Sequence, residues 1–250
     1  MRARQRIAVV TGASSGFGAA TARALVREGF FVVMGARREE RLAALAAELG
    51  SDNARWAPLD VTDPVSVASF CAAVERVDVL VNNAGNAFGG DPVADASEAK
   101  WRAMFELNVL GVLRMTQALL PKLLSSGDAI LINVGSIAGF EVYPGGAGYT
   151  ASKHALRALT RTLRLELLGK PVRVTEIAPG LAETEFALVR FDGDRERARQ
   201  LYEGMTPLTA VDIAAAIAWV ATRPSHVNID EIVIRPRDQA TAMLVHRKLD

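Results

Sequence analysis

The sequence contains almost no cysteine and no excess of either charge. Cys71 is the one cysteine among 250 residues, so no internal disulfide can form. It lies in VASFCAAV with no accompanying histidine pattern, which favours a small buried helix residue over a nucleophile. The 29 Lys and Arg residues nearly balance the 28 Asp and Glu residues and are spread along the chain. We therefore expect neither nucleic-acid binding nor attachment to a membrane surface.

Long apolar runs and metal-ligand patterns are also missing. The apolar segment near the start, residues 7–10, ends at a Thr-Gly turn and is too short for the core of a secretory signal. No other stretch approaches the length that spans a membrane. We therefore expect a soluble, cytoplasmic protein. The three histidines, His154, His226 and His246, show no ligand spacing, so we expect no catalytic metal.

Strand-like and helix-like segments alternate along the whole chain. Longer Ala- and Leu-rich segments with helical spacing, such as RREERLAALAAELG, separate short β-branched runs. This alternation predicts an α/β fold, namely a Rossmann-type, doubly wound, seven-stranded parallel sheet with helices on both faces. The predicted strands are residues 7–10, 31–34, 55–59, 79–81, 129–134, 172–177 and 231–234.

No linker, repeat or low-complexity segment divides the sequence, so residues 1–250 are expected to form a single domain. One stretch, residues 183–207, interrupts the alternation because it is charged and poor in strand-forming residues. We expect this stretch to form a mobile flap near the substrate.

A glycine-rich turn, TGASSGFG at residues 11–18, joins the first predicted strand to the first predicted helix. Its glycines follow a G-x-x-x-G-x-G spacing, which alone would also fit a tight bend. At this place in a doubly wound sheet, however, glycines let the backbone approach a pyrophosphate, and the helix N-terminus attracts negative charge. The sequence therefore predicts a nucleotide-phosphate site that comprises Gly12, Ser14, Ser15, Gly16, Phe17 and Gly18.

The end of the second predicted strand bears on the choice of cofactor. An NAD-preferring site would place a carboxylate there for the ribose 2′-hydroxyl, but the sequence reads Gly35-Ala36-Arg37-Arg38. Paired guanidiniums suit a 2′-phosphate, so Arg37 and Arg38 predict NADP. The alternative is two solvated arginines at the start of a helix, where the helix dipole disfavours cations.

Two further loops follow predicted strands. VNNAGNAFGG, residues 81–90, has consecutive amides and a glycine at the end of a strand, which suits a backbone that runs close to a ligand. We place Asn83 and Gly85 in the cofactor site on this ground. In LDVTD, residues 59–63, Asp60 and Val61 are further candidates, although Asp60 also fits a plain helix-capping neighbourhood.

The residues best suited to chemistry lie in GYTASKHAL and NVGSIAG. Tyr149 and Lys153 are spaced i, i+4 on one helix face, so the ammonium should lie near the phenol. A neighbouring cation favours the phenolate, which predicts that the pKa of Tyr149 is lowered and that Tyr149 acts as general acid and base. Ser136 follows a buried strand, where its hydroxyl would hold a carbonyl oxygen. Each of these features, taken alone, also fits a chance pattern or a turn.

Taken together, the features resemble the short-chain dehydrogenase/reductase family. The resemblance covers nearly the whole chain and implies that a nicotinamide passes a hydride to or from carbon while the tyrosine exchanges a proton with oxygen. It also implies a homotetramer. The matching positions are TGASSGFG, Asp60, NNAG at 82–85, Asn108 in ELNVLG, Ser136, the Tyr149/Lys153 pair and PGLAET at 179–184.

The resemblance also implies roles for single residues. Ser136 would orient the substrate oxygen, Lys153 would also bind the nicotinamide ribose, and Asn108 would hold a water in a proton relay to solvent. The carboxamide of the nicotinamide would be held by Pro179, Gly180, Leu181 and Thr184.

Parts of the sequence further resemble the NADP-dependent 3-hydroxy acid dehydrogenases, which oxidise serine and related β-hydroxy acids. The matching parts are GARREERL, TEFALVRFDGD and the C-terminal segment that starts at PLTAVD. VYPGGAGY, beside the tyrosine, departs from that pattern. Arg190 would recognise the substrate carboxylate; alternatively it is solvated or pairs with Asp192 or Asp194. A broad ketone or aldehyde reductase and a non-catalytic NADP-binding sensor or scaffold are the alternative functions. The complete catalytic set opposes the sensor.

Overall fold

A seven-stranded parallel sheet forms the centre of the molecule in the computed structural model, which describes residues 5–248. The strand order is β3-β2-β1-β4-β5-β6-β7, and each neighbouring pair is parallel. The predicted Rossmann-type sheet and its seven strands are therefore confirmed. The strands are β1 (Ile7–Thr11), β2 (Phe31–Ala36), β3 (Ala54–Pro58), β4 (Val79–Asn82), β5 (Ala129–Val134), β6 (Val172–Pro179) and β7 (Glu231–Ile234).

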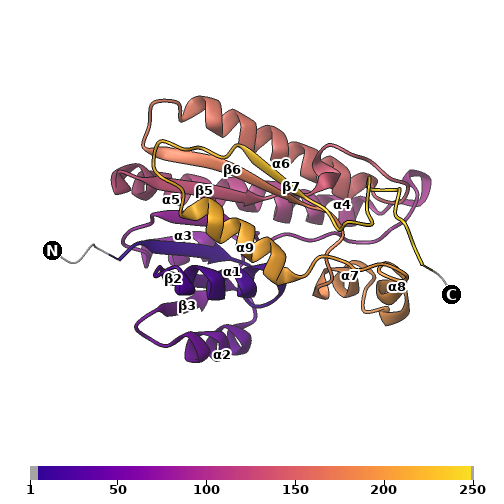
Figure 1. Cartoon of the computed structure of the whole chain (residues 1–250), viewed down its shortest axis with the longest axis horizontal. Coiled ribbons are helices and arrows are strands. Elements are labelled where there is room, and N and C mark those ends of the chain that lie inside the picture. The colour runs from indigo at the N-terminus through magenta and orange to yellow at the C-terminus, as the bar shows by residue number, and fades with distance from the viewer. Residues whose placement is uncertain (1–4, 249–250) are drawn as a thin grey trace.

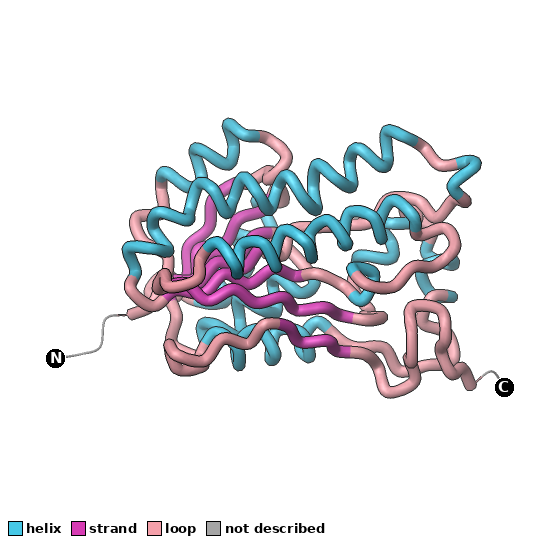
Figure 2. Tube along the Cα trace, turned by 90° about the horizontal axis from the view of Figure 1, so that it is seen from above, coloured by secondary structure: helices cyan, strands magenta, loops and turns pink. Residues whose placement is uncertain are grey.

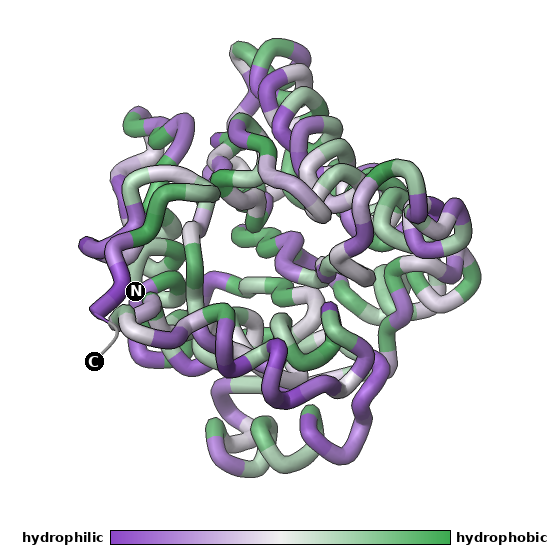
Figure 3. Tube along the Cα trace, turned by 90° about the vertical axis from the view of Figure 1, so that its right-hand side faces the viewer, coloured by the Kyte–Doolittle hydropathy of each residue, from purple (hydrophilic) through white to green (hydrophobic). Residues whose placement is uncertain are grey.

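Helices cover both faces of the sheet, as the view from above in Figure 2 shows. One face carries α1, α2 and α9, and the other carries α3, α5 and α6. In Figure 3 green and purple stretches alternate along the helices, which is typical of helices that cover a sheet. The helices are α1 (Gly16–Arg27), α2 (Glu39–Leu49), α3 (Pro64–Ala72), α4 (Glu98–Phe105), α5 (Gly111–Ser126), α6 (Ala147–Glu166), α7 (Glu185–Arg190), α8 (Arg195–Gln200) and α9 (Ala210–Ala221).

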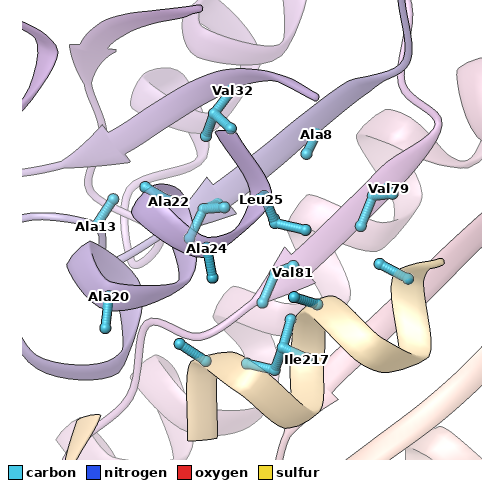
Figure 4. Close-up of a cluster of buried hydrophobic side chains, with 14 of the residues drawn as sticks. Ala8, Ala13, Ala20, Ala22, Ala24, Leu25, Val32, Val79, Val81 and Ile217 are labelled. Atoms are coloured by element: carbon cyan, nitrogen blue, oxygen red, sulfur yellow. The ribbon is translucent and has the colours of Figure 1, made fainter. Parts of the chain in front are cut away.

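The core on the α1 face is built from small side chains, which allow close packing. Figure 4 shows alanines of α1 together with Leu25 against Val79 and Val81 of β4, with Ile217 of α9 on the same cluster. All six residues of β5 are buried, because this strand is covered on both faces. Cys71 is buried on α3, and burial raises the pKa of its thiol to about 11, so the interpretation as an inert core residue fits.

The strand order reverses between β1 and β4, and the loops that follow these two strands therefore diverge from each other at the carboxyl edge of the sheet. A doubly wound sheet binds nucleotides in the crevice that such a divergence opens. The glycine-rich turn follows β1 and the NNAG segment follows β4, so the topology brings both predicted loops to one place.

The stretch 183–207 contains two short helices, α7 and α8, which lie together at one end of the molecule beyond the carboxyl edge of the sheet (Figure 1). The C-terminal segment packs against it, since Arg247 donates to the carbonyls of Leu201 and Glu203. Whether this stretch moves as a flap stays a prediction. Across residues 5–248, no helix has both the length and the apolar character that crossing a bilayer requires.

Candidate active site

A cavity of about 640 Å³ opens at the carboxyl edge of the sheet, within the range of small-molecule sites. Nearly all predicted site residues line it, including Ser136, Tyr149 and Lys153. Gly18 and Asn108 do not line it, because each lies behind the residues that do. The predicted residues that line the cavity are Gly12, Ser14, Ser15, Gly16, Phe17, Arg37, Arg38, Asp60, Val61, Asn83, Gly85, Ser136, Tyr149, Lys153, Pro179, Gly180, Leu181, Thr184 and Arg190.

The glycine-rich turn has the backbone that a phosphate cradle needs. Gly12 and Gly16 adopt positive φ angles of 66° and 51°, which side-chain-bearing residues rarely adopt. A Cβ on Gly18 would overlap the carbonyl of Gly12, so only glycine lets α1 begin this close to the turn. Asn83 donates to the Thr11 carbonyl at 2.8 Å and ties the turn to the loop after β4. This glycine-lined cradle at a helix N-terminus fits the pyrophosphate of a dinucleotide.

Of the two arginines predicted for the 2′-phosphate, Arg38 is the one held in place. Its Nε donates to Ser14 Oγ at 3.1 Å, one terminal nitrogen donates to Ser15 and the other to Glu185 at 2.8 Å. Arg41, which sequence reasoning missed, also pairs with Glu185 at 2.7 Å. Hydrogen bonds from these two arginines hold the pKa of Glu185 below its usual range.

Arg37 is less constrained, and its neighbour Asp60 has partners in its own loop. The Arg37 side chain is 74% exposed and lies 4.0 Å from Asp60. Asp60 accepts hydrogen bonds from the backbone and hydroxyl of Thr62. Although burial works to raise the pKa of Asp60, these bonds and the Arg37 charge keep it below its ordinary value. Asp63, rather than Asp60, caps α3 through the amide of Val65, and Asp60 also lines the cavity.

The predicted catalytic residues converge from β5 and α6. Ser136 follows β5, and its hydroxyl lies 3.4 Å from the Pro179 carbonyl. Lys153 is 5% exposed and donates from Nζ to the Val134 carbonyl at 2.8 Å. Its Nζ lies 5.9 Å from the centre of the Tyr149 ring, so the i, i+4 spacing does bring the two side chains together.

The expected lowering of the Tyr149 pKa is wrong for this arrangement. Burial raises the pKa of the phenol, and Tyr143 raises it further, while a hydrogen bond to Ser136 and the charge of Arg190 lower it. Burial also lowers the pKa of Lys153 to about 8, against the charge of Glu176, which raises it. The sequence spacing identified the neighbouring cation, but it carried no information on how strongly the surrounding protein desolvates both groups.

Asn108 lies in a π turn (Glu106–Leu110) between α4 and α5, a rare irregularity that is frequent at functional sites. Its side-chain amide accepts from the Asn86 amide at 2.9 Å and donates to the Asn86 carbonyl at 2.8 Å and to Ser152. A Cβ on Gly85 would lie 2.9 Å from the Asn108 side-chain oxygen, so glycine is needed there. Asn108 is 1% exposed, and its part in a proton relay stays a prediction.

The segment 179–184 lies between β6 and the glycine-rich turn. The Leu181 amide donates to Gln239 at 2.8 Å, and Thr184 caps α7 through the Phe186 amide. The Thr184 side chain lies close to Gly16, since a Cβ there would meet it at 3.5 Å. Two residues further on, the Phe186 ring meets the Tyr149 ring edge-on at 5.6 Å. Nothing in the sequence pattern indicated that Gln239 and Phe186 would reach the site.

Arg190 is a buried cation whose hydrogen-bond partners are neutral oxygens. It is 9% exposed and donates to the carbonyls of Gly89 and Gly145 and to the Tyr143 hydroxyl. The two aspartates proposed as its alternative partners are engaged elsewhere among the described residues. Asp192 pairs with Lys100 at 2.9 Å, and Asp194 caps α8. A guanidinium that faces a cavity in this state is suited to bind an anion.

The described part of the chain has no group of three His, Cys, Asp or Glu side chains arranged to hold a metal ion.

Comparison with known proteins agrees with this arrangement. A family model for short chain dehydrogenase matches residues 6–193. An uncharacterized oxidoreductase of Mycobacterium tuberculosis is 63% identical, over 96% of this chain and 94% of its own length. Sulfoacetaldehyde reductase 2 of Chromohalobacter salexigens is 44% identical, over 94% and 95%. The closed form of a serine dehydrogenase complexed with NADP⁺ superimposes with a TM-score of 0.92 at 41% identity and covers 97% of this chain and all of that one.

Proposed function

Since this chain belongs to the short-chain dehydrogenase family of oxidoreductases, and a solved relative is a serine dehydrogenase complexed with NADP⁺, we propose that its substrate is a small 3-hydroxy acid or β-hydroxy amino acid. The observation that carries this proposal is Arg190, a buried cation that lines the same cavity as Ser136 and Tyr149. An uncharged alcohol would leave that cation without an anionic partner, whereas a carboxylate would pair with it.

The cofactor fits the described residues. The glycine-rich turn suits the pyrophosphate, and the Arg38 guanidinium, fixed by two serine hydroxyls, suits the 2′-phosphate. Bound NADP accepts or supplies the hydride. Lys153 and the segment that contains Pro179 and Thr184 line the cavity where the nicotinamide end of the cofactor is proposed to lie.

The chain's own residues then have distinct tasks. Arg190 holds the acid group of the substrate, and the Ser136 hydroxyl donates to the substrate oxygen and orients it. Tyr149 takes the proton from the hydroxyl in oxidation and returns it to the carbonyl oxygen in reduction. Because burial disfavours its phenolate, Tyr149 needs the Ser136 hydrogen bond and the positive charges of Arg190 and of the neighbouring Lys153 to stabilise the charge when the proton leaves. Phe186 covers the tyrosine ring and excludes water from it.

A second candidate is the reduction of a short aldehyde that carries an acidic group. The relative named as a sulfoacetaldehyde reductase favours it, because a guanidinium pairs with a sulfonate as readily as with a carboxylate. Both candidates require the same cation and the same tyrosine, and they differ in the substrate and in the direction of reaction. A general reductase of uncharged ketones, in contrast, gives Arg190 no task.

The test is turnover by the Arg190→Met variant, which keeps the length of the side chain and removes its charge. With serine or 3-hydroxybutyrate and NADP, kcat/KM should fall by about 10- to 100-fold, as loss of one charge-assisted hydrogen bond predicts. With an uncharged secondary alcohol it should change little. The matched control is Arg195→Met, an exposed arginine of α8, which should retain wild-type values on both substrates. Sulfoacetaldehyde with NADPH, tested on the same proteins, distinguishes the second candidate.

Equal losses on the charged and the uncharged substrate would assign Arg190 to the scaffold and would contradict the hydroxy-acid proposal. If only the sulfonated aldehyde turns over, the second candidate replaces the first.

Three further expectations stay proposals. The flap role of residues 183–207 is supported by the contacts that Glu185 makes with Arg38 and Phe186 makes with Tyr149, since both Arg38 and Tyr149 line the cavity. A homotetramer is supported by β7, an edge strand, and by the exposed Leu165 and Leu168 at the end of α6. Light scattering of the purified protein tests the tetramer, and cell fractionation tests the cytoplasmic location.

A further inference from the structure

A carboxylate lies inside the sheet, behind the catalytic lysine. Glu176 is the one acidic residue of β6, a strand whose eight residues are all buried, and it is 2% exposed. Its Oε1 is fully buried and has no hydrogen-bond partner among residues 5–248. A buried carboxylate is costly unless a charge or a hydrogen bond compensates it. The sequence pattern of a buried parallel strand calls for an apolar residue here.

The sheet register directs this carboxylate toward α6. Glu176 is paired with Asn133 of β5, and Asn133 donates to Thr160 of α6, so this face of the sheet is the one that α6 covers. A Cβ on Gly135 would overlap Glu176 Oε1, and the glycine therefore leaves space for the carboxylate. Val134, the residue before Gly135, accepts the hydrogen bond from Lys153 Nζ. The buried carboxylate and the buried ammonium thus lie against two consecutive residues, Gly135 and Val134, at the end of β5.

Four charged side chains surround Glu176. From α6 come Lys153, Arg157 and Arg161, which lie four residues apart on one helix face, and from β7 comes Glu231. Arg157 Nη1 is 3.9 Å from Glu176 Oε1, but both terminal nitrogens of Arg157 donate to Glu231, at 2.5 and 2.7 Å.

The other two cations, Arg161 and Lys153, differ in their carboxylate partners. The Arg161 side chain is 60% exposed and lies 4.0 Å from Glu231. Arg157 and Arg161 therefore pair first with Glu231. Lys153 forms no ion pair with a carboxylate among the described residues, and Glu176 is the carboxylate whose charge acts on the pKa of Lys153.

The electrostatic effects of burial on the two groups are opposite in sign. Burial lowers the pKa of Lys153 to about 8, and Glu176 raises it. Burial raises the pKa of Glu176, and Arg157 and Lys153 lower it. Each group therefore favours the charged form of the other, against an environment that disfavours both charges.

We propose that Glu176 is a positioning residue, the buried counterion that keeps the Lys153 amine charged and directed at the Tyr149 side of the cavity. The inference rests on the proposed catalytic role of Lys153. A neutral amine at this site would still donate to the Val134 carbonyl, but it would no longer stabilise a phenolate on Tyr149. The alternative is that Glu176 only fastens β6 to α6 through Arg157. That alternative predicts a loss of stability without any change in the titration of Lys153.

The test is the pH profile of kcat/KM for Glu176→Gln, which keeps the shape of the side chain and removes its charge. The profile reports groups of the free enzyme. Activity that needs the ammonium is present below the Lys153 pKa and is lost as pH rises through it. Without Glu176 this pKa falls, so the alkaline limb should move to lower pH by on the order of one unit. The activity of the variant relative to wild type should then recover as pH is lowered.

The matched control is Glu231→Gln, which removes a carboxylate from the neighbouring strand. Glu231 pairs with Arg157, and Glu176, not Glu231, is the carboxylate that raises the Lys153 pKa, so the alkaline limb of the Glu231→Gln profile should stay in place. Titration of Lys153 itself, by NMR of the protein with labelled lysine side chains, gives the same comparison without relying on turnover. Glu176→Asp, which keeps the charge but withdraws it from α6, should give a smaller shift in the same direction and replaces Glu176→Gln if that variant does not fold.

The inference would be overturned if the alkaline limb and the Lys153 titration stay unchanged in the Glu176 variants. It would also be overturned if both move equally in Glu231→Gln. Turnover by the wild-type enzyme and its loss in Lys153→Met would still support the proposed function in that case. If the wild-type protein turns over neither a hydroxy acid nor an aldehyde, the proposed function is overturned instead. The NMR titration of Lys153 then remains the test of the role of Glu176.

Discussion

The selection of NADP over NAD is predicted to depend on a competition between two anions for Arg38. Arg38 donates to Ser14 and Ser15 of the glycine-rich turn, and its third nitrogen donates to Glu185 of α7. The carboxylate of Glu185 is held ionised, because hydrogen bonds from Arg38 and Arg41 lower its pKa. Glu185 therefore opposes a 2′-phosphate at the guanidiniums that favour it, and the two substitutions Arg38→Met and Glu185→Gln should act in opposite directions.

The expected magnitudes follow from exposure. A hydrogen bond to a charged group contributes about 1.5–3 kcal/mol, and the Arg38 side chain is 44% exposed, so screening by solvent favours the lower end. Arg38→Met should weaken NADP by about tenfold. Glu185→Gln removes a partly exposed competing charge and should tighten NADP by about two- to fivefold. NAD, which has no 2′-phosphate, should change by less than about twofold in either variant.

The assay is titration of NADPH and NADH fluorescence with each variant at low and high ionic strength. The differences should shrink at high salt, because exposed charges are screened. The ion pair Arg23–Glu48, with side chains 40% and 52% exposed, links α1 to α2 away from the cavity, so Arg23→Met is the matched control and should leave both affinities unchanged. Equal losses of NADP and NAD in Arg38→Met, or weaker NADP binding in Glu185→Gln, would refute the competition.

Two further predictions concern the tyrosine and the glycine-rich turn. Tyr149→Phe deletes the ionisable hydroxyl and keeps the ring against Phe186. The kcat should therefore fall by about 10²- to 10⁴-fold, while the affinity for NADPH stays unchanged. Near-normal turnover would remove Tyr149 from the mechanism. Gly18→Ala places a methyl group against the Gly12 carbonyl and should abolish cofactor binding or lower the melting temperature. A thermal scan with and without NADP measures both effects. If cofactor affinity and melting temperature are both unchanged, the close approach of α1 to the turn is contradicted.

The strands and the long helices could be predicted from the sequence because burial on both faces leaves a plain pattern. β5, for example, is an apolar run with all six residues buried. The glycine-rich turn and the Tyr149/Lys153 spacing could be predicted for a similar reason, since both depend on residues close together in the chain. The boundaries were less certain, and β6 extends to Pro179, two residues beyond the predicted end.

Features that depend on contacts between distant segments could not be predicted in this way. α7 and α8 have six residues each, too few for a helical period to stand out. The π turn around Asn108 is a five-residue irregularity between two α-helices. The raised pKa of Tyr149 reflects burial by several elements, and the pairing of Arg41 with Glu185 joins residues 144 positions apart. None of these leaves a local signal in the sequence.

The departure at VYPGGAGY from the pattern of the 3-hydroxy acid dehydrogenases has a structural counterpart, which bears on how the substrate is selected. Gly145 has a φ of 71°, and a Cβ there would overlap the Gly90 carbonyl, so this segment crosses directly over the loop after β4. In that position Tyr143 and Gly145 each accept a hydrogen bond from Arg190, and Gly89 of the crossed loop accepts a third. Two segments that are far apart in the sequence, one with Gly89 and one with Tyr143 and Gly145, therefore hold one guanidinium with neutral oxygens.

Neutral acceptors position this cation without neutralising it. A carboxylate in place of any of the three oxygens would cancel the charge that an acidic substrate needs, whereas solvent exposure would screen it. The unusual residues beside Tyr149 are thus best understood as support for Arg190 rather than as direct contacts with the reacting carbon. A change at Gly145 should for this reason alter the preference among acidic and uncharged substrates before it alters the chemistry at Tyr149.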